Sequence, residues 1–567
     1  IDIIGVEPSV GHTIQGLKNM KESYPPGIYD KKRLDRIVSV EDEEAFETAR
    51  LLAKKEGIFV GMSSGAAMAA AVNLSQELES GTIVTILPDS GERYLSTSLF
   101  SVPDKKGSFR LFNTLDREKV DFIPNEKGRV GIYSCGPTVH ARMHLGEARR
   151  FVFSDLLCRH LEYSGYEVRH VMNITDLDDK TIEGAEKAGQ DLEKFTQHHI
   201  KLFKNDLELL SVKPASEYPL AGEHVDDMVE LTEKIVNKGL AYEKLRSVYF
   251  DISRLPSYGN LSGIKLDKIK VGSTVDLEDY EKDNPKDFTL LKRAKLSELK
   301  KGIYRETQWG NVRPSWHIQC PAMAMKYLGP NFDIHTSARH LVFPHHENEI
   351  AIAKAATGKE LANYWMHCGP VMIDGKEVDE DSRHLDISNL MEEGVSPRQI
   401  RFVLLSTHYR KPVVWSQERL KQAGKVLKRL DNFVETLSLV EKGRNFSDLD
   451  HLISSISKEF RAAMDDDLNI SGALSCILKK IKEINTLVDN ELIDSKGAKQ
   501  ILDAFKKIDR VLKIFSFGNP VFDREAKELI KQREAARKEK NWVLADEIRL
   551  KLELKGVDLR DKKAVKT

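Results

Sequence analysis

Four residues of types that bind soft metal ions are spread through the sequence. Cys135 follows a strand-like run, Cys320 follows Trp316, and His345 and Glu349 lie in the run PHHENEI. The i, i+4 spacing of the last two puts both side chains on one helix face. Two thiolates, an imidazole and a carboxylate suit a tetrahedral zinc site. No C-x-x-C pair is present, so the residues alone leave open two buried free cysteines beside a surface His/Glu pair.

A second group of residues is suited to nucleotide chemistry. His144-Leu145-Gly146-Glu147 stands where a predicted strand gives way to a predicted helix. A glycine there lets a nucleotide approach the backbone, and the first helical turn offers free N–H groups and a positive dipole end to phosphate. A histidine can donate to a phosphate oxygen as charge develops during adenylation. The alternative is a helix-capping glycine beside a surface histidine.

An α/β scaffold has to position both groups. VGIYSCG is a predicted strand, HLGEARRFVFSDLLCRHLEYSG a helix and YEVRHVMNITD the next strand. This βαβ pattern predicts a doubly wound, Rossmann-type sheet with ligands at the carboxyl ends of its strands. Beyond residue 396 the pattern becomes helical, with apolar residues three and four apart on one helix face. They are Leu420, Ala423, Leu427, Leu430, Val434 and Leu437.

The first hundred residues form a separate α/β pattern. IDIIGVE is a predicted strand, DEEAFETARLLAKKE a helix and TIVTILPDSG a further strand, which together predict a parallel sheet. The polar stretch VPDKKGSFR is a predicted linker. Because the chain opens at Ile1 directly on a strand, we expect it to begin inside a longer protein.

Composition narrows the class of protein. A chain of 567 residues is too long for one hydrophobic core, and 41% hydrophobic and 31% charged residues fit a globular protein. The formal net charge of −1 means that any RNA contact must come from local patches. Five widely spaced cysteines favour a reducing cytoplasm over a secreted disulfide framework. No apolar run approaches the ~20 residues of a membrane span.

A series of short runs carries a family resemblance from Phe112 to about Asp561. In order they are FNTL, YSCGPTV, HLGEAR, NITDLDDK, PSWHIQCPAM, FPHHENEI, VMIDGK, LLSTHYRKPV, AMDDDLN and ADEIR. The chain thereby resembles the cysteinyl-tRNA synthetases of class I. The resemblance implies zinc ligands at Cys135, Cys320, His345 and Glu349. It also implies a catalytic, ATP-binding His144, further ATP contacts from Gly146 and Lys376, and a cysteine and adenylate pocket lined by Thr175 and Trp316.

The implied activity is ATP-dependent activation of L-cysteine, with magnesium, and transfer to tRNA(Cys). One zinc ion per chain would select the substrate, because a soft, thiolate-rich site binds serine's hydroxyl far less well than a thiolate. The expected domains are a partial cysteine-synthase-like domain (1–101), a linker (102–111), a catalytic domain (112–395) with an insertion near 235–305, a helical anticodon-region bundle (396–520) and a basic tRNA-contacting tail (521–567).

The sequence departs from that family where the nucleotide would bind. After VMIDG the family carries a lysine-rich KMSKS loop, but here Glu377, Asp379, Glu380 and Asp381 stand instead. Carboxylates there oppose the charge of a leaving pyrophosphate. The family's DIHGGG turn reads DIHTSARH and ends at His340. The alternatives are therefore a synthetase-like protein that binds cysteine or tRNA but aminoacylates poorly, and a cysteine ligase acting on an aminosugar, against which the long helical region argues.

The runs IGVEP, HTIQGL, EGIFVGMSSGAA and ILPDSGERYLST of the first hundred residues resemble a second family. They resemble the C-terminal part of cysteine synthase, an enzyme that depends on pyridoxal phosphate. The resemblance implies that Ser90 contacts the pyridine nitrogen of that cofactor. Because the family's Schiff-base lysine lies in an earlier segment, we expect this segment alone not to hold pyridoxal phosphate.

Overall fold

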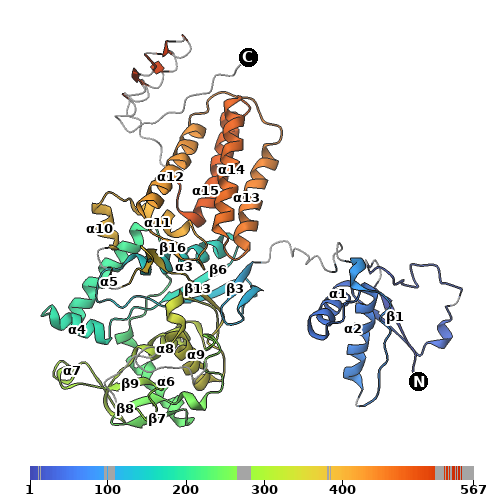
Figure 1. Ribbon diagram of the computed structural model, residues 1–567, viewed down its shortest axis with the longest axis horizontal. Coiled ribbons are helices and arrows are strands. Elements are labelled where there is room, and N and C mark those ends of the chain that lie inside the picture. The colour runs from blue at the N-terminus through green and yellow to red at the C-terminus, as the bar shows by residue number, and fades with distance from the viewer. Residues whose placement is uncertain are drawn as a thin grey trace. The chain divides into compact units, whose positions relative to one another are not determined.

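The chain folds into two compact units, Ile1–Ser108 and Phe109–Thr567 (Figure 1). The computed structural model describes residues 1–9, 12, 14–27, 29–78, 80–94, 99, 109–264, 282–379, 382, 385–517 and scattered positions from 529 to 551. The expected linker falls outside the described residues over 102–108, whereas Arg110 already belongs to a strand. Most of the expected basic tail also lies outside them. No helix among the described residues combines the length and apolar composition that crossing a bilayer requires.

The first unit pairs two parallel strands with two helices. Its regular elements are β1 (Ile4–Pro8), β2 (Arg36–Val40), α1 (Asp42–Leu51) and α2 (Met62–Glu77). Strands β1 and β2 run parallel, as the alternating pattern predicts. Helices α1 and α2 pack closely at Gly65, because a Cβ there would lie 2.1 Å from the carbonyl oxygen of Ala45.

One strand prediction in this unit is wrong. Residues 82–88 form no strand, and Val84 and Ile86 are 87% and 78% exposed. A β-propensity run becomes a strand only where a neighbour supplies hydrogen bonds and covers one face. The described residues of this unit provide no such neighbour for Thr82–Pro88.

The second unit is built on a four-stranded sheet of order β13-β12-β5-β6. Its strands are β5 (Arg129–Ser134), β6 (Glu167–Met172), β12 (Phe332–Ala338) and β13 (Ala362–Cys368), and all neighbours are parallel. Helix α3 (Leu145–Tyr163) connects β5 to β6, and α9 (His345–Thr357) connects β12 to β13. The predicted doubly wound α/β fold is confirmed, and parallel topology brings the carboxyl ends of the strands to one edge.

An antiparallel sheet of order β10-β11-β9-β8-β7 is inserted between β6 and β12. It consists of β7 (Ala241–Lys244), β8 (Ser247–Phe250), β9 (Phe288–Arg293), β10 (Arg305–Thr307) and β11 (Gly310–Pro314). The helices of this stretch of the chain are α4 (Asp179–Lys187), α5 (Leu192–Leu209), α6 (Val225–Asn237), α7 (Leu296–Lys300) and α8 (Trp316–Leu328). Smaller elements of the unit are β3 (Arg110–Asn113), β4 (Glu118–Asp121), β14 (Val371–Ile373), β15 (Lys376–Glu377), β16 (Val413–Val414) and α10 (Ile387–Glu392).

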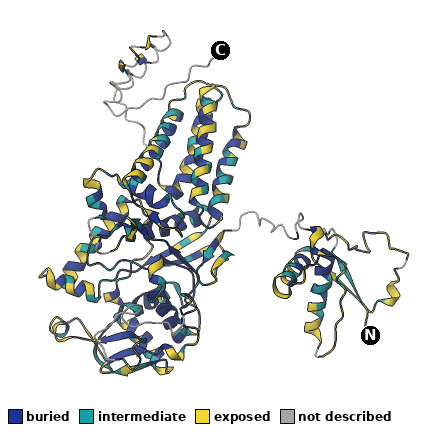
Figure 2. Cartoon of the chain, viewed as in Figure 1, coloured by how far each residue is buried: buried dark blue, intermediate teal, exposed yellow. Residues whose placement is uncertain are grey.

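The C-terminal part of the described chain is a helical bundle. Helix α11 (Pro397–Leu405) leads into α12 (Gln417–Ser438), α13 (Leu449–Asp465), α14 (Ile470–Asp489) and α15 (Ser495–Leu512). Each bundle helix buries one side and exposes the other (Figure 2). The apolar stripe predicted on α12 is confirmed, because all six of its residues are buried, together with Phe433.

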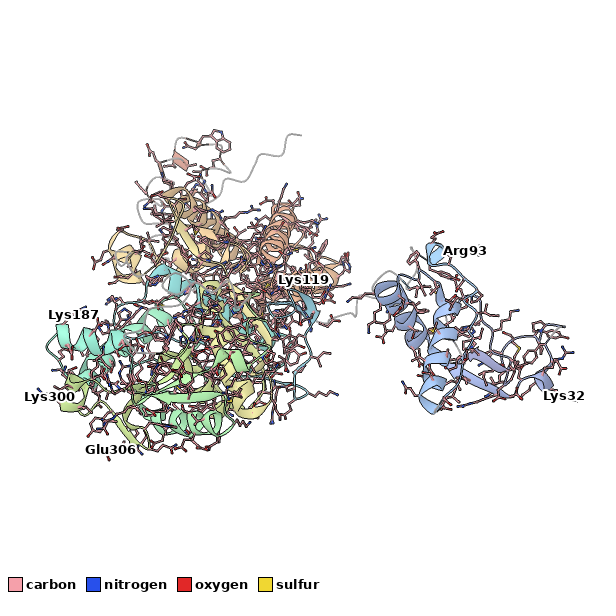
Figure 3. The ribbon with its side chains drawn as sticks, turned by 60° about the horizontal axis from the view of Figure 1, so that its bottom comes forward. Lys32, Arg93, Lys119, Lys187, Lys300 and Glu306 are labelled. Carbon is pink, nitrogen blue, oxygen red and sulfur yellow. The ribbon has the colours of Figure 1, made fainter. Side chains whose placement is uncertain are left out.

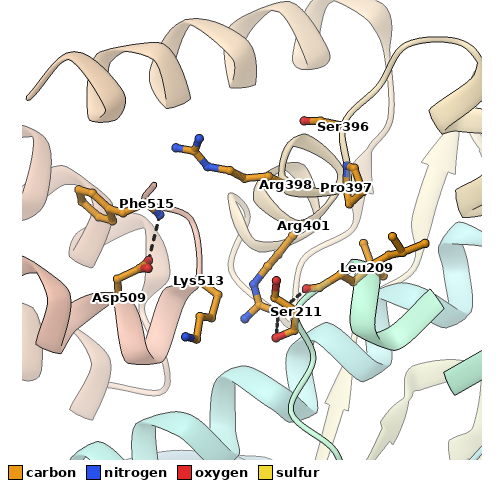
Figure 4. Close-up of a pocket in the computed structure, with 10 residues that line it drawn as sticks. Leu209, Ser211, Ser396, Pro397, Arg398, Arg401, Asp509, Lys513 and Phe515 are labelled. Carbon is orange, nitrogen blue, oxygen red and sulfur yellow. Dashed lines mark hydrogen bonds between the residues drawn. The ribbon is translucent and has the colours of Figure 1, made fainter. Parts of the chain in front are cut away.

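Arginines of α11 fasten this bundle to α3 and hold its own helices together. Arg401 of α11 donates to Asp155 of α3 at 2.6 Å and to the carbonyl oxygens of Leu210 and Leu512. Arg398 donates to Asp431 of α12. A cavity of about 390 Å³ lies at this junction (Figure 4). Its arginines are already paired within the protein, so the cavity is a seam between packed elements.

Candidate functional site

Four buried side chains meet where the carboxyl end of the parallel sheet faces two helices. Cys135 follows β5, Cys320 lies in α8, and His345 and Glu349 lie one turn apart in α9. Their ligand atoms all lie within 4.8 Å of one another. The structure therefore brings together, from three separate segments, all four residues that the sequence predicted as metal ligands.

Three of the distances between these atoms fit a zinc ion, whereas His345 Nε2 and Glu349 Oε1 lie at a hydrogen-bond distance of 2.9 Å. The two sulfurs are 3.9 Å apart, and Cys320 Sγ is 3.6 Å from His345 Nε2. With zinc bonds of about 2.3 Å to sulfur and 2.0–2.1 Å to nitrogen, tetrahedral geometry requires roughly 3.8 Å and 3.6 Å for those edges. Cys135 Sγ is also 3.5 Å from Glu349 Oε1. Two thiols, an imidazole and a carboxylate at these separations form a donor set suited to zinc.

Burial makes the charges of this cluster strongly interdependent. Burial, the hydrogen bond with Cys320 and the charge of Glu349 raise the pKa of Cys135 well above its usual value. Burial acts to raise the pKa of Glu349, but the charges of His335 and His345 hold that pKa well below its usual range. Burial lowers the pKa of His345, but Glu349 outweighs it and raises that pKa to about 9. A cation in the pocket would favour the thiolate form of Cys135.

Sequence reasoning missed a set of buried histidines behind the cluster. His335 Nε2 lies 2.8 Å from Glu349 Oε2, and His346 Nε2 lies 3.5 Å from Cys135 Sγ. These four residues form a second group close enough to hold a metal ion. Two sequence features could have indicated them: His346, the second histidine of the doublet in PHHENEI, and His335, the first histidine of DIHTSARH. Only the fold shows that both point at the same thiol and carboxylate.

The two predicted substrate residues lie at different places around this pocket. The Trp316 ring stacks on His345, with ring centroids 3.8 Å apart and an angle of 12° between the planes. Thr175 is buried and accepts a hydrogen bond from the Asn173 side chain. Asn173 also accepts from the backbone N–H of Gly136, where a Cβ would lie 1.5 Å from the Asn173 carbonyl oxygen. Glycine is therefore required beside Cys135 for the β5 and β6 ends to approach.

The predicted nucleotide residues lie at the N-terminus of α3. His144 is the N-cap residue of that helix in extended conformation. A Cβ on Gly146 would lie 2.5 Å from the carbonyl oxygen of Val378, so the loop after β15 packs on this turn. His144 and Arg150 approach Glu147 at 3.8 Å and 3.3 Å. A carboxylate therefore stands between a histidine and an arginine at the start of this helix.

The loop with acidic residues also reaches this end of the site. Lys376 and Glu377 form β15 and are exposed, and Glu377 lies 3.5 Å from His340. Burial and the charge of Asp379 raise the pKa of Glu377. Glu380 lies outside the described residues. The two departures from the family pattern, at DIHTSARH and at the KMSKS position, therefore face each other in space.

Comparisons with known proteins agree with this architecture. Residues 121–425 match the family described as the tRNA synthetases class I (C) catalytic domain. The chain is 39% identical to the cysteine–tRNA ligase of Methanosarcina acetivorans over 461 residues, which cover 80% of this chain and 97% of that protein. It is 38% identical to the cysteine–tRNA ligase of Chlamydia muridarum over 468 residues, which cover 80% and 98%. The chain belongs to the cysteine–tRNA ligase family.

Membership of the cysteine–tRNA ligase family confirms the sequence-based recognition. Residues 459–516 match the DALR domain, which falls in the helical bundle. A methionyl-tRNA synthetase of Mycobacterium tuberculosis with methionyl-adenylate is similar in structure, with a TM-score of 0.52 and 14% identity over 71% of this chain and 94% of that one. At that identity the likeness concerns the fold alone.

The first unit carries a second family likeness alongside the cysteine–tRNA ligase part. Residues 1–89 match the family described as pyridoxal-phosphate dependent enzymes. Ser90 forms an isolated bridge with Val60, and the neighbouring Asp89 accepts hydrogen bonds from the backbone N–H groups of Ser63 and Ser64. Asp89 therefore caps the start of α2. The cofactor contact of Ser90 stays a prediction.

Proposed function

We propose that this chain activates L-cysteine with ATP and transfers it to tRNA(Cys). The observation that carries the proposal is the buried cluster of Cys135, Cys320, His345 and Glu349. It lies at the carboxyl end of a parallel sheet, the edge where doubly wound folds bind ligands. The family match supports the same activity.

We assign the four clustered residues as ligands of one zinc ion per chain. When bound, zinc supplies a soft Lewis acid that prefers a thiolate over a hydroxyl ligand. The protein's own part is to bury the site: Cys135, Cys320, His345 and Glu349 are each at most 4% exposed. The hydroxyl of serine would be a poor ligand in this site. A hydrophobic pocket alone separates near-isosteres only weakly, so the ligand set explains selection of cysteine.

Trp316 and Thr175 would shape the space above the metal ligands. Stacking of Trp316 on His345 fixes the imidazole plane and closes one side of the pocket. Thr175 stands at the end of the segment after β6, held through its backbone by Pro137 and Val139. Both residues are proposed to orient the substrate's main-chain atoms, leaving its thiol toward the cluster.

The start of α3 is proposed to receive ATP, which brings magnesium with its phosphates. Gly146 lies in the first turn of α3, where the loop at Val378 packs against the backbone, and the N-terminal turn of a helix favours phosphate. His144 is proposed to donate to a phosphate oxygen as the adenylate forms. Lys376 is the cation on the β15 hairpin that can reach toward the leaving pyrophosphate.

The deciding experiment is pyrophosphate exchange that depends on both cysteine and ATP. Radiolabelled pyrophosphate should enter ATP with L-cysteine but at least about 100-fold less efficiently with L-serine. Aminoacylation of tRNA(Cys) should follow in the same preparation. Zinc-replete protein that binds tRNA(Cys) but shows no exchange would overturn the proposal and leave a binding protein.

A further inference from the structure

Three of the family-like runs lie outside the pocket, and they meet at one buried carboxylate. Asp467 of the run AMDDDLN has 0% exposure. Its Oδ1 accepts from the backbone N–H of Phe112 at 2.8 Å and from the hydroxyl of Tyr409 at 2.6 Å. Its Oδ2 accepts from Arg410 Nε at 2.9 Å. The runs FNTL, LLSTHYRKPV and AMDDDLN therefore converge on a single side chain.

Asp467 and its partners come from three different parts of the second unit. Asp467 follows α13 of the bundle, Phe112 lies in β3, and Tyr409 and Arg410 follow α11. The backbone N–H of Asp467 also donates to the Arg110 carbonyl oxygen at 2.8 Å. The Asp467 backbone is left-handed, at φ 59°, a conformation that costs a non-glycine residue energy. This cost is offset where a buried carboxylate gains several donors.

Strand β3 leads from this carboxylate to the metal pocket. Asn113 accepts from the backbone N–H of Trp365 at 2.8 Å, and Thr114 N–H donates to the Trp365 carbonyl oxygen at 2.8 Å. Thr114 Oγ1 shares a hydrogen bond of 2.7 Å with His367 Nδ1. The FNTL run thus connects Asp467 at one end with a histidine of β13 at the other.

The last links are the buried histidines. His367 Nε2 is 2.9 Å from His346 Nδ1, and His346 Nε2 is 3.5 Å from Cys135 Sγ. An imidazole held through its far nitrogen keeps one orientation toward a metal ligand. A continuous set of contacts therefore runs from the bundle to the thiol that would bind zinc.

We propose that Asp467 and Thr114 are positioning residues that couple the helical bundle to the cysteine pocket. The proposal rests on the proposed function, since it takes tRNA(Cys) as the ligand of the bundle and L-cysteine as the ligand of the pocket. When tRNA(Cys) binds, it fixes the position of the bundle, and contacts along β3 pass this change of position to His367 and His346. A chain of contacts becomes coupling only when both ends change the same equilibrium.

The seam at Arg398 and Arg401 differs from this connection. Arg401 binds the bundle to α3 and to the end of α5, whereas Arg398 pairs with Asp431 inside the bundle (Figure 4). Among the described residues their hydrogen bonds go to Asp155, Asp431 and backbone carbonyl oxygens, and Ser154, the neighbour of Asp155, lies 3.3 Å from Ser134 beside Cys135. That route ends on the Ser134 hydroxyl, whereas the β3 connection ends on Cys135 Sγ itself. We therefore assign stability to the arginine seam and communication to the β3 connection.

The test measures the Kd of L-cysteine by calorimetry on the zinc-loaded full chain, with and without saturating tRNA(Cys) transcript. The variants are Asp467→Asn, Thr114→Val and the double variant. The matched control is Asp466→Asn, because the carboxylate of this neighbouring residue pairs, among the described residues, only with Lys119, at 2.7 Å. Lys119 is labelled in Figure 3. Zinc content and the melting temperature are recorded for each protein.

In the unsubstituted chain and in Asp466→Asn, tRNA should change the Kd of cysteine by at least about fivefold. In Asp467→Asn, in Thr114→Val and in the double variant the change should fall below about twofold, with zinc content unchanged. The double variant should lose no more than either single one, because both act on one connection. If Asp467→Asn does not fold, Thr114→Val alone decides.

Two results would overturn the coupling: no effect of tRNA on the unsubstituted chain, or an effect that survives in Thr114→Val. Calorimetry needs no turnover, so a chain that binds cysteine without pyrophosphate exchange would contradict the proposed function and still decide the coupling. Failure of cysteine to bind at all would contradict both.

Discussion

The two ends of the proposed active site differ in how completely they are built. At the metal end the four proposed ligands are buried, lie within 4.8 Å of one another and are backed by histidines. At the nucleotide end, Lys376 and Glu377 are exposed and Glu147 stands beside His144. Buried charges need defined partners, whereas exposed ones are screened by water and salt. In the proposed site, cysteine selection therefore depends on packing, and nucleotide affinity depends on single surface charges.

Removal of the metal is expected to separate the two ends most strongly. Chelation should abolish measurable cysteine binding and leave the Kd of ATP within about twofold. It should also lower the melting temperature, because zinc at 1,000 times its Kd stabilises the fold by about 4 kcal/mol. Calorimetry and thermal unfolding before and after chelation, with zinc added back as the control, check this. Equal loss of ATP and cysteine binding would show that the ends are one structural unit.

Cys320→Ser should weaken zinc binding at least about 100-fold, since substitutions beyond the first ligands already cost 10–100-fold. A competing chromophoric chelator measures the affinity. Cys476→Ser, at a half-buried free cysteine of α14, is the matched control and should keep it. Tight zinc retained in Cys320→Ser would indicate that the ion uses the second group, with His335 and His346.

Gly146→Ala should act only at the nucleotide end. Its Cβ would lie 2.5 Å from the Val378 carbonyl oxygen, so the loop after β15 must move. We expect the KM for ATP to rise about tenfold, or about 1.4 kcal/mol, with zinc and cysteine binding unchanged. Pyrophosphate exchange at varied ATP gives the value. Gly27→Ala is the control, because no atom lies within 4 Å of its Cβ.

Glu377→Lys should give the smallest effect, in the favourable direction. Replacing the exposed carboxylate beside His340 adds attraction for the phosphates, and the KM for ATP should fall roughly three- to tenfold. The gain should shrink as salt is raised. Glu306→Lys, on exposed β10, controls for net charge and should change nothing. A KM that rises in Glu377→Lys would mean that the carboxylate itself contributes to nucleotide binding.

Local patterns predicted most of the fold around the site. The run from VGIYSCG to YEVRHVMNITD became β5, α3 and β6, and the apolar stripe became the buried face of α12. The run Thr82–Pro88 failed because strand formation depends on a partner that sequence pattern does not supply. Helix geometry predicted that His345 and Glu349 lie on one face of α9. Only the family resemblance indicated that His345, and not His346, faces Cys320.

The sequence by itself determined the βαβ pattern from local spacing, and its order of short runs determined the family and, through the resemblance, the four residues proposed to bind metal. The tertiary structure decided what lies beside them. It brought His335, His346 and His367 behind Cys135, set Glu377 against His340, and joined Asp467 to Phe112 across 355 residues of chain. Contacts between distant segments depend on how elements pack, and no local periodicity records that packing.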